Sequence, residues 1–369
     1  MTPIAAVLSE LDRQSSEPLD VVFVCDKGFS EQARKIMQTA PMDVDVRIIS
    51  AGKLRRYEHF RFVDYLTTPS VILSNFVDVF KLAIGFFQSL GIMMRFRPDV
   101  VFAKGGFVCL PIGWAARLMR VPVVIHDSDA RPGLTNRLLA PFATAIATGY
   151  PLENYSYDTT KSRYTGVPIR HDIEPVSEAN QSVAKRSLGV DPDKLLVVAT
   201  GGGLGSRQIN HAMVASVGVV RSHSARAIVI AGKKHYQETL EIARECGDVL
   251  TVQDFVSEGM IELLSAADVV VTRASATSLQ ELAGLKKAII VVPARQLGDQ
   301  HKNAAVYREA DAAIVLNDDQ LEAGELATTL DALFADSDRR DVLAAHLHDF
   351  AHPDAAQAVA QLILETAAA

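Results

Sequence analysis

The sequence contains few cysteines, and they stand far apart. Cys25, Cys109 and Cys246 are the three cysteines of the 369-residue chain, and none stands at the short spacing of a zinc site or a redox pair. An odd number of separated cysteines is also unlike the disulfide framework of a small secreted domain. The sequence therefore predicts free thiols in a reducing compartment, and we expect no metal site.

The chain also lacks an excess of positive charge and a long uninterrupted apolar run, and we expect no signal peptide. Its 37 basic and 44 acidic residues give a net charge of −7, so a nucleic-acid partner is not expected. Residues 1–7 have no basic region and no long apolar core. The longest charge-free apolar window, residues 82–94, has about thirteen residues, too few for a helix crossing a bilayer of roughly 30 Å.

Alternating strand and helix patterns fill a length that suits two domains. Short Val- and Ile-rich runs, followed by Gly, Pro, Ser or Asp, are typical of parallel strands buried on both faces. Helical patterns between them favour βαβ units. The expected strands are residues 21–24, 46–49, 100–103, 121–125, 145–148, 195–200, 227–230, 249–252, 268–271 and 288–292.

These patterns predict an α/β protein with two Rossmann-like, doubly wound parallel-sheet domains facing each other across a cleft. The first domain is expected at residues 1–165 and the second at residues 166–340, with residues 166–180 as connector. Residues 341–369 are Ala-rich and helical, and we expect them to pack back on the first domain. Ligands of such sheets bind at the carboxyl ends of the strands.

A glycine-rich segment, residues 201–210, follows one predicted strand and begins a helical pattern. Backbone N–H groups in a strand, glycine loop and helix start can bind a phosphate, although a plain tight turn explains this segment alone equally well. Two later junctions are similar: Glu281 could accept hydrogen bonds from a ribose, and Asp299 and Gln300 from sugar hydroxyls. Arg170 in the connector could neutralise a diphosphate. His301, at a polar helix start, is expected to be solvated.

In the first half, polar loops follow successive predicted strands at residues 104–107, 126–129 and 133–136. His126 and Asp127 form a compact acid–base pair there and are the candidate catalytic residues. A structural histidine satisfied by the backbone remains the alternative.

In this order, residues 98–107, 122–126, 133–136, 166–170, 201–210, 268–281 and 299–304 resemble the MurG-type glycosyltransferases over nearly the whole chain. That family transfers N-acetylglucosamine from UDP-GlcNAc to lipid I, the lipid-linked muramyl peptide, forming lipid II in peptidoglycan biosynthesis. The resemblance implies a GT-B fold and an inverting enzyme without a metal or cofactor, acting peripherally at the cytoplasmic face of the membrane.

The resemblance also implies roles for individual residues. The acceptor side comprises Gly105, Gly106, Phe107 and Asn136, and the proton acceptor is His126 or Asp127. In the donor site, Phe255 and Val256 correspond to the uracil contact, Glu281 to the ribose contact, and Ala276 and Thr277 to the helix start at the diphosphate. The implied UDP-GlcNAc site is Arg170, Gly202, Gly203, Ser206, Phe255, Val256, Ala276, Thr277, Glu281, Asp299 and Gln300.

The sequence departs from the family pattern at several positions. Gly203 replaces the usual serine of the glycine loop, and we expect Ser206 to substitute for it in part. Asp127 and Asp129 replace the usual glutamate and asparagine. The family's first strand and Gly-Gly-His loop are not seen before residues 2–11, so we expect a first sheet without its central strand and an unstable or inactive chain.

An apolar helical stripe points to a membrane surface. Its residues are Ile72, Phe76, Phe80, Ala83, Phe87, Leu90 and Met94, widened by Ile84, Phe86 and Met93. Nearby Arg55, Arg56, Arg61, Lys81, Arg95 and Arg97 could contact anionic headgroups. An ordinary core helix is the alternative. Two other functions stay open: a UDP-sugar GT-B enzyme with another acceptor, or an epimerase, and a non-catalytic UDP-sugar-binding subunit.

Overall fold

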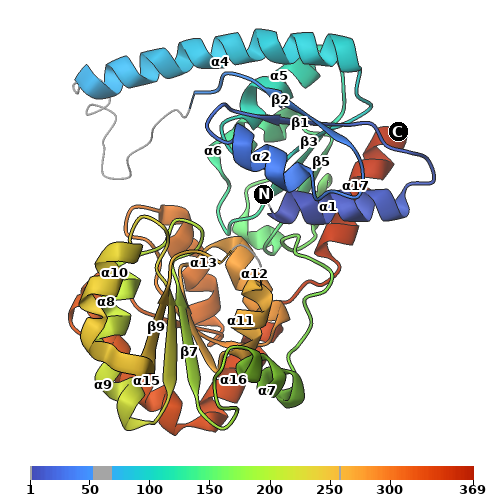
Figure 1. Cartoon of the computed structure of the whole chain (residues 1–369). Helices are drawn as coiled ribbons and strands as arrows, with labels where there is room; N and C mark the ends of the chain where they lie inside the picture. The colour runs from blue at the N-terminus through green and yellow to red at the C-terminus, as the bar shows by residue number, and fades with distance from the viewer. Residues whose placement is uncertain (1, 53–68, 257–258) are drawn as a thin grey trace. The chain divides into compact units, whose positions relative to one another are not determined.

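The computed structural model describes residues 2–52, 69–256 and 259–369. The chain forms two compact units (Figure 1). Unit 1 comprises Met1–His171 and His352–Ala369, and unit 2 comprises Asp172–Ala351. The boundaries between the units therefore lie at residues 171/172 and 351/352. The sequence predicts them at residues 165/166 and 340/341.

The described strands of unit 1 form two separate parallel sheets. Strands β1 (Val21–Cys25) and β2 (Val44–Ile48) pair with each other. The second sheet has the order β3 (Val101–Ala103), β4 (Val123–Asp127), β5 (Ala145–Thr148) and β6 (Ser162–Tyr164). Within the described residues, β1 and β3 each pair along one edge only.

Helices cover both faces of the four-stranded sheet of unit 1. On one face, Val7 and Leu8 of α1 and Val359 of α17 pack against Val124. On the other face, Ala115 packs with Ile125 and its neighbours. The described helices of this unit are α1 (Thr2–Gln14), α2 (Ser30–Met37), α4 (Pro69–Phe96), α5 (Cys109–Leu118), α6 (Leu134–Leu139), η1 (Ala140–Phe142), η2 (Leu152–Asn154) and α17 (Ala355–Ala368).

Unit 2 contains one six-stranded parallel sheet. Its order is β12 (Ile314–Val315), β11 (Ala288–Val291), β10 (Val269–Thr272), β7 (Leu196–Thr200), β8 (Arg226–Ile230) and β9 (Leu250–Gln253). The chain runs outward from β7 to β9 and then returns to begin the other half at β10, beside β7. Loops diverge at this point, which is where open parallel sheets bind ligands.

Two helical layers enclose this sheet. Its central strands are rich in Val and Ile and are buried throughout, as expected for parallel strands covered on both sides. The helices are α7 (Glu178–Ser187), α8 (Arg207–Ala215), α9 (Val217–Ser222), α10 (Tyr236–Ile242), η3 (Arg244–Val249), α11 (Met260–Ala266), α12 (Ala276–Gly284), α13 (Gly298–Glu309), α14 (Asp318–Glu322), α15 (Glu325–Ala335) and α16 (Ser337–His348).

Every strand expected from the sequence is present, with its ends displaced by at most two residues or so. Two strands were not expected. The short β6 is a polar Ser-Arg-Tyr segment at the sheet edge, and β12 has only two residues. The segment predicted as one terminal helical element, residues 341–369, is divided: α16 lies in unit 2 and α17 in unit 1.

Candidate active site

The glycine loop of unit 2 joins β7 to α8, as the sequence predicts. Gly202 and Gly205 have positive φ angles of 73° and 74°, which favour glycine. A Cβ on Gly205 would lie 2.1 Å from the carbonyl oxygen of Ala231. The loop therefore packs directly on the backbone that follows β8, and its exposed segment at Gly203 faces open space.

Ser206 ends this loop and caps α8. Its Oγ accepts hydrogen bonds from the Ile209 N–H at 3.3 Å and from Nη2 of Arg273 at 2.7 Å. The side chain is buried, with 3% of the residue exposed. The structure thus gives Ser206 a role inside the loop, and the expectation that its hydroxyl substitutes for a ligand contact at Gly203 is not supported.

Arg273 connects the loops at the carboxyl edge of the unit 2 sheet, a role that the sequence did not predict. Besides Ser206, its guanidinium donates to Oε1 of Gln208 at 3.0 Å and to the carbonyl oxygen of Val292 at 3.1 Å, and it lies 3.6 Å from Asp318. Burial lowers its pKa, and Asp318 opposes that shift. The position of Arg273 directly after a buried strand is the sequence feature that could have indicated this role.

The junction between β10 and α12 lies beside this arginine. Ala276 is buried at the start of α12, while Thr277 and Glu281 are half-buried on its first turns. Asn303 of α13 donates from Nδ2 to the carbonyl oxygen of Ala274 at 3.0 Å, which fixes the loop before α12. These contacts hold the first N–H groups of α12 in a defined position, although no side chain caps that helix.

The remaining predicted donor residues of unit 2 follow β9 and β11. Phe255 is exposed, and Nζ of Lys233 lies 5.4 Å from its ring centre; Val256 beside it is half-buried. Oε1 of Gln300 accepts the Ala294 N–H at 2.9 Å, and Asp299 is exposed. Because all these strands are parallel, their carboxyl ends gather the predicted donor residues of unit 2 at one edge (Figure 1).

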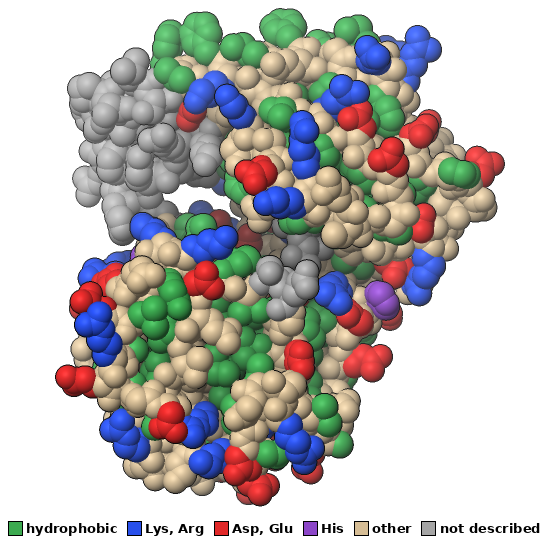
Figure 2. Space-filling view, viewed as in Figure 1, with side chains coloured by type: hydrophobic (Ala, Val, Ile, Leu, Met, Phe, Trp, Pro, Cys, Tyr) green, Lys and Arg blue, Asp and Glu red, His purple; other side chains and the backbone are tan. Residues whose placement is uncertain are grey.

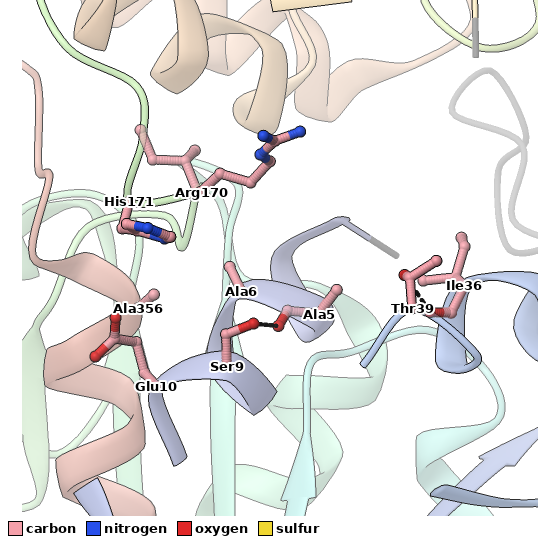
Figure 3. A pocket seen from close by; sticks show the side chains of 10 residues that line it. Ala5, Ala6, Ser9, Glu10, Ile36, Thr39, Arg170, His171 and Ala356 are labelled. Carbon is pink, nitrogen blue, oxygen red and sulfur yellow. Dashed lines mark hydrogen bonds between the residues drawn. The ribbon is translucent and has the colours of Figure 1, made fainter. Parts of the chain in front are cut away.

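Arg170 belongs to unit 1, where it lines a cavity of about 360 Å³. In Figure 3, the connector with Arg170 and His171 lies across from Ser9 and Glu10 of α1. The Glu10 carboxylate pairs with Arg13 at 2.6 Å. No other predicted site residue lines this cavity.

The predicted acceptor-side residues gather at the carboxyl ends of β3 and β4. Gly105 and Gly106 have φ angles of 88° and 86°, and Phe107 is half-buried. Asn136 is buried and donates from Nδ2 to the carbonyl oxygen of His126 at 3.1 Å. The structure therefore brings these four residues together, as the sequence predicts.

His126 lies in the interior, with 0% of the residue exposed. Its Nε2 lies 3.0 Å from the carbonyl oxygen of Gly166, and its Nδ1 lies 3.1 Å from Oγ of Ser128. Desolvation lowers its pKa to about 3, with Lys104 acting in the same direction. The ring is neutral and both nitrogens are bonded, so the geometry supports the structural alternative over the predicted base role.

Asp127 is also enclosed, with 4% exposed. Its Oδ2 accepts hydrogen bonds from the Tyr157 hydroxyl at 2.7 Å and from the Gly133 N–H at 3.0 Å. Desolvation raises its pKa to about 6, against the effect of these hydrogen bonds. A carboxylate with a pKa in this range suits proton transfer near neutral pH better than the buried His126 does.

Helix α4 presents an apolar face to solvent. Its exposed side chains include Phe76, Val77, Val79, Phe80, Ile84, Phe87 and Met94, with Phe80 56% and Phe87 70% exposed. Figure 2 shows hydrophobic side chains along this edge of unit 1. Ile72 lies in the part of the helix whose side chains the structure does not describe, and Arg55, Arg56 and Arg61 lie outside the described residues.

The opposite face of α4 packs on unit 1. Asp78, Leu82, Ser89 and Met93 are buried there, and a Cβ on Gly85 would lie 1.9 Å from the carbonyl oxygen of Ser50. The segment Phe76–Phe96, with 21 residues and a mean hydropathy of 1.5, has the length and composition of a membrane-crossing helix. The apolar segment predicted from the sequence, residues 82–94, was therefore too short, because it included only an uninterrupted run of uncharged residues.

We predict that Arg273→Met lowers the free energy of unfolding by roughly 2–4 kcal/mol, because it leaves buried acceptors in three loops without their donor. Urea denaturation measures this change. Arg207→Met is the matched control: Arg207 pairs with Glu238 at the surface, so the change should be within experimental error. Equal effects of the two substitutions would contradict the role assigned to Arg273.

Comparisons with known proteins match most of the chain to one family of glycosyltransferases. Residues 2–148 match the model of the glycosyltransferase family 28 N-terminal domain, and residues 196–359 match that of its C-terminal domain. The UDP-N-acetylglucosamine--N-acetylmuramyl-(pentapeptide) pyrophosphoryl-undecaprenol N-acetylglucosamine transferase of Clostridium botulinum (strain Kyoto / Type A2) is 34% identical over 289 residues, which are 78% of this chain and 76% of the relative. The protein of the same name from Geobacillus thermodenitrificans is 32% identical over 294 residues, 79% of this chain and 77% of the relative.

Solved structures share the fold. Acinetobacter baumannii MurG has a TM-score of 0.72 at 21% identity, covering 98% of this chain and 95% of that one. A UDP-GlcNAc 2-epimerase from Neisseria meningitidis has a TM-score of 0.67 at 10% identity, covering 99% and 96%. The predicted fold class, α/β with two Rossmann-like parallel-sheet domains of the GT-B type, is confirmed. The chain belongs to glycosyltransferase family 28 and, within it, to the family of MurG-type N-acetylglucosamine transferases.

Proposed function

We propose that this protein transfers N-acetylglucosamine from UDP-GlcNAc to the lipid-linked acceptor lipid I, forming lipid II. Family membership at 34% identity supports this proposal. The observation that carries it is the gathering of the glycine loop, the α12 start and Glu281 at the β7–β10 switch point of unit 2. Such an edge binds nucleotide phosphates in parallel α/β sheets.

In this proposal, unit 2 binds the donor. N–H groups at Gly202 and Gly203 and at the start of α12, with Ala276 and Thr277, contact the diphosphate. Glu281 accepts hydrogen bonds from the ribose, and the backbone at Phe255 and Val256 meets the uracil. Asp299 and Gln300 contact the sugar, and Arg170 supplies positive charge to the leaving diphosphate.

The reaction is a single displacement with inversion at the anomeric carbon. A base removes the proton from the acceptor hydroxyl, whose oxygen bonds to that carbon while its bond to the UDP oxygen breaks. UDP leaves, and the charge that develops on it is stabilised by the α12 N-terminus. Of the two candidate bases, Asp127 is favoured over His126, because the pKa of Asp127 lies near 6 and the nitrogens of His126 are occupied.

We also propose that α4 lies in the plane of an anionic membrane surface, on the cytoplasmic side. One face of the helix packs on unit 1 through Leu82, Gly85 and Met93, so only its exposed apolar face is available to lipid. Exposed Lys81, Arg95 and Arg97 add positive charge near that face. A crossing orientation would require this packing to separate.

We predict that the purified protein converts UDP-GlcNAc and a lipid I analogue to UDP and the lipid II analogue, in contrast to the inactive chain expected from the sequence, because the relatives that share 34% identity over 78% of this chain are named as such transferases. Glu281→Gln should raise KM for UDP-GlcNAc about tenfold or more, through loss of charge-assisted hydrogen bonds to the ribose. Chromatography of the labelled lipid product measures the reaction. Conversion of UDP-GlcNAc to its 2-epimer without consumption of the lipid would contradict the proposal and indicate an epimerase.

We predict that Gly203→Ser lowers KM for UDP-GlcNAc several-fold, about the effect of one added hydrogen bond. The position has no strained φ and open space for a Cβ, so the melting temperature should not change. Gly205→Ser is the contrasting variant, because its backbone contacts Ala231 and its φ is positive; it should destabilise the protein. An unchanged KM in Gly203→Ser would count against a diphosphate at this loop.

We predict that the double variant Phe80→Ser, Phe87→Ser reduces binding to phosphatidylglycerol vesicles more than tenfold, because each phenylalanine contributes roughly 1.5–3 kcal/mol when buried. Vesicle sedimentation measures the bound fraction. Phe29→Ser, at an exposed phenylalanine of unit 1 outside α4, is the control and should bind as the wild type does. Retention on membranes after a carbonate wash would contradict the in-plane orientation.

A further inference from the structure

Lys104 stands where β3 ends, directly before Gly105 and Gly106. The two glycines have positive φ angles, and a Cβ on Gly106 would meet nothing within 4 Å. The Lys104 side chain is half-buried at the same carboxyl edge as Asn136. The function proposed above assigns this lysine no part.

A chain of hydrogen bonds fixes the Lys104 ammonium. The carbonyl oxygen of Gly166 can only accept, so Nε2 of His126 carries the proton between them. Nδ1 of His126 therefore accepts from the Ser128 hydroxyl, whose oxygen in turn accepts from Nζ of Lys104 at 2.7 Å. The donor and the acceptor of each of these three hydrogen bonds are therefore assigned, and the series ends at the Lys104 ammonium.

The Lys104 ammonium has N–H donors that make no hydrogen bond within the described residues. A lysine carries three N–H donors, and within the described part of the chain Nζ makes one hydrogen bond, to Ser128, and no ion pair. Burial lowers its pKa, while Asp129, Asp127 and the Cys109 thiol act in the opposite direction. Asp127 already accepts from Tyr157 and Gly133. A half-buried cation with unused donors is costly unless it meets an anion.

We propose that Lys104 binds a phosphate of the acceptor's diphosphate, and that Ser128 and His126 are positioning residues that aim the ammonium at it. The proposal rests on the function proposed above, which supplies an acceptor with a diphosphate. Gly105 and Gly106 leave the backbone beside Lys104 without side chains, so a phosphate can approach closely. The function proposed above assigns the donor's diphosphate to the glycine loop, the α12 start and Arg170, and Lys104 provides a separate positive charge for the acceptor.

The kinetic test compares Lys104→Met and Lys104→Arg using a lipid I analogue with a short prenyl chain. Lys104→Met should raise KM for the acceptor about tenfold or more, the effect of one charge-assisted hydrogen bond, while KM for UDP-GlcNAc changes less than about twofold. Lys104→Arg keeps the charge and should recover part of the affinity. Lys35→Met, at an exposed lysine of α2 in the same unit, is the control and should behave as the wild type.

The positioning role has its own readout. Ser128→Ala should raise the acceptor KM less than Lys104→Met does, and it should have no further effect in a Lys104→Met background. Additive effects in the double variant would show that Ser128 acts independently of Lys104 and would overturn the positioning role. Melting temperatures separate these effects from unfolding, and retained function in Lys104→Arg shows that the site tolerates a large cation.

Binding of inorganic pyrophosphate, followed by phosphorus NMR, tests the site without turnover. Pyrophosphate should bind the wild type and compete with the acceptor, and Lys104→Met should lose this binding. If pyrophosphate binding depends on Lys104 in a protein that transfers no sugar, the anion site stands and the proposed function fails. If transfer proceeds with an unchanged acceptor KM in Lys104→Met, or if the Lys104-dependent competition is against UDP-GlcNAc, the proposal is overturned.

Discussion

Parallel pairing of buried strands is the constraint on which both units depend. Because every described strand pairs in parallel, its carboxyl end lies at the same edge as those of its neighbours. Loops far apart in sequence, such as the one at Gly202 and the one before Glu281, therefore meet at one place. Parallel strands covered on both faces also consist of near-continuous runs of Val and Ile, so their positions can be predicted from the sequence.

The two units differ in how fully this pairing is achieved. Unit 2 has a continuous six-stranded sheet whose central strands are buried, whereas the described strands of unit 1 divide into a pair and a group of four. Strand β2 is mostly exposed, and β1 is half-buried over most of its length. Unpaired strand edges expose backbone hydrogen-bonding groups. At the carboxyl edge of unit 1, His126 contacts Gly166 and Ser128, and Asp127 accepts hydrogen bonds from Tyr157 and Gly133.

Among the described residues, each unit has a partly or fully buried cation at its carboxyl edge, and the hydrogen-bonding groups of the two cations are satisfied differently. Arg273 donates to Ser206, Gln208 and Val292 and lies near Asp318, so its donors are used inside the protein. Within the described residues, the Lys104 ammonium makes one hydrogen bond, to Ser128. The planar guanidinium suits several fixed acceptors at once, while a lysine ammonium on a flexible stem keeps donors available for a ligand. This contrast separates a residue that holds loops from one that can bind substrate.

The sequence by itself determined the α/β class, the positions of the buried strands and the gathering of Gly105 and Asn136 at one edge, because hydrophobic runs and glycine loops are local signals. It did not reveal β6, whose Ser-Arg-Tyr segment has no apolar run, or the length of α4, where single charged residues interrupt the pattern. Only the tertiary structure decided that His126 is buried with both nitrogens bonded, that Ser206 caps its own loop and that Arg273 joins three loops. Those roles depend on which groups a side chain meets across the fold, and burial and hydrogen bonding between distant residues leave no pattern in the local sequence.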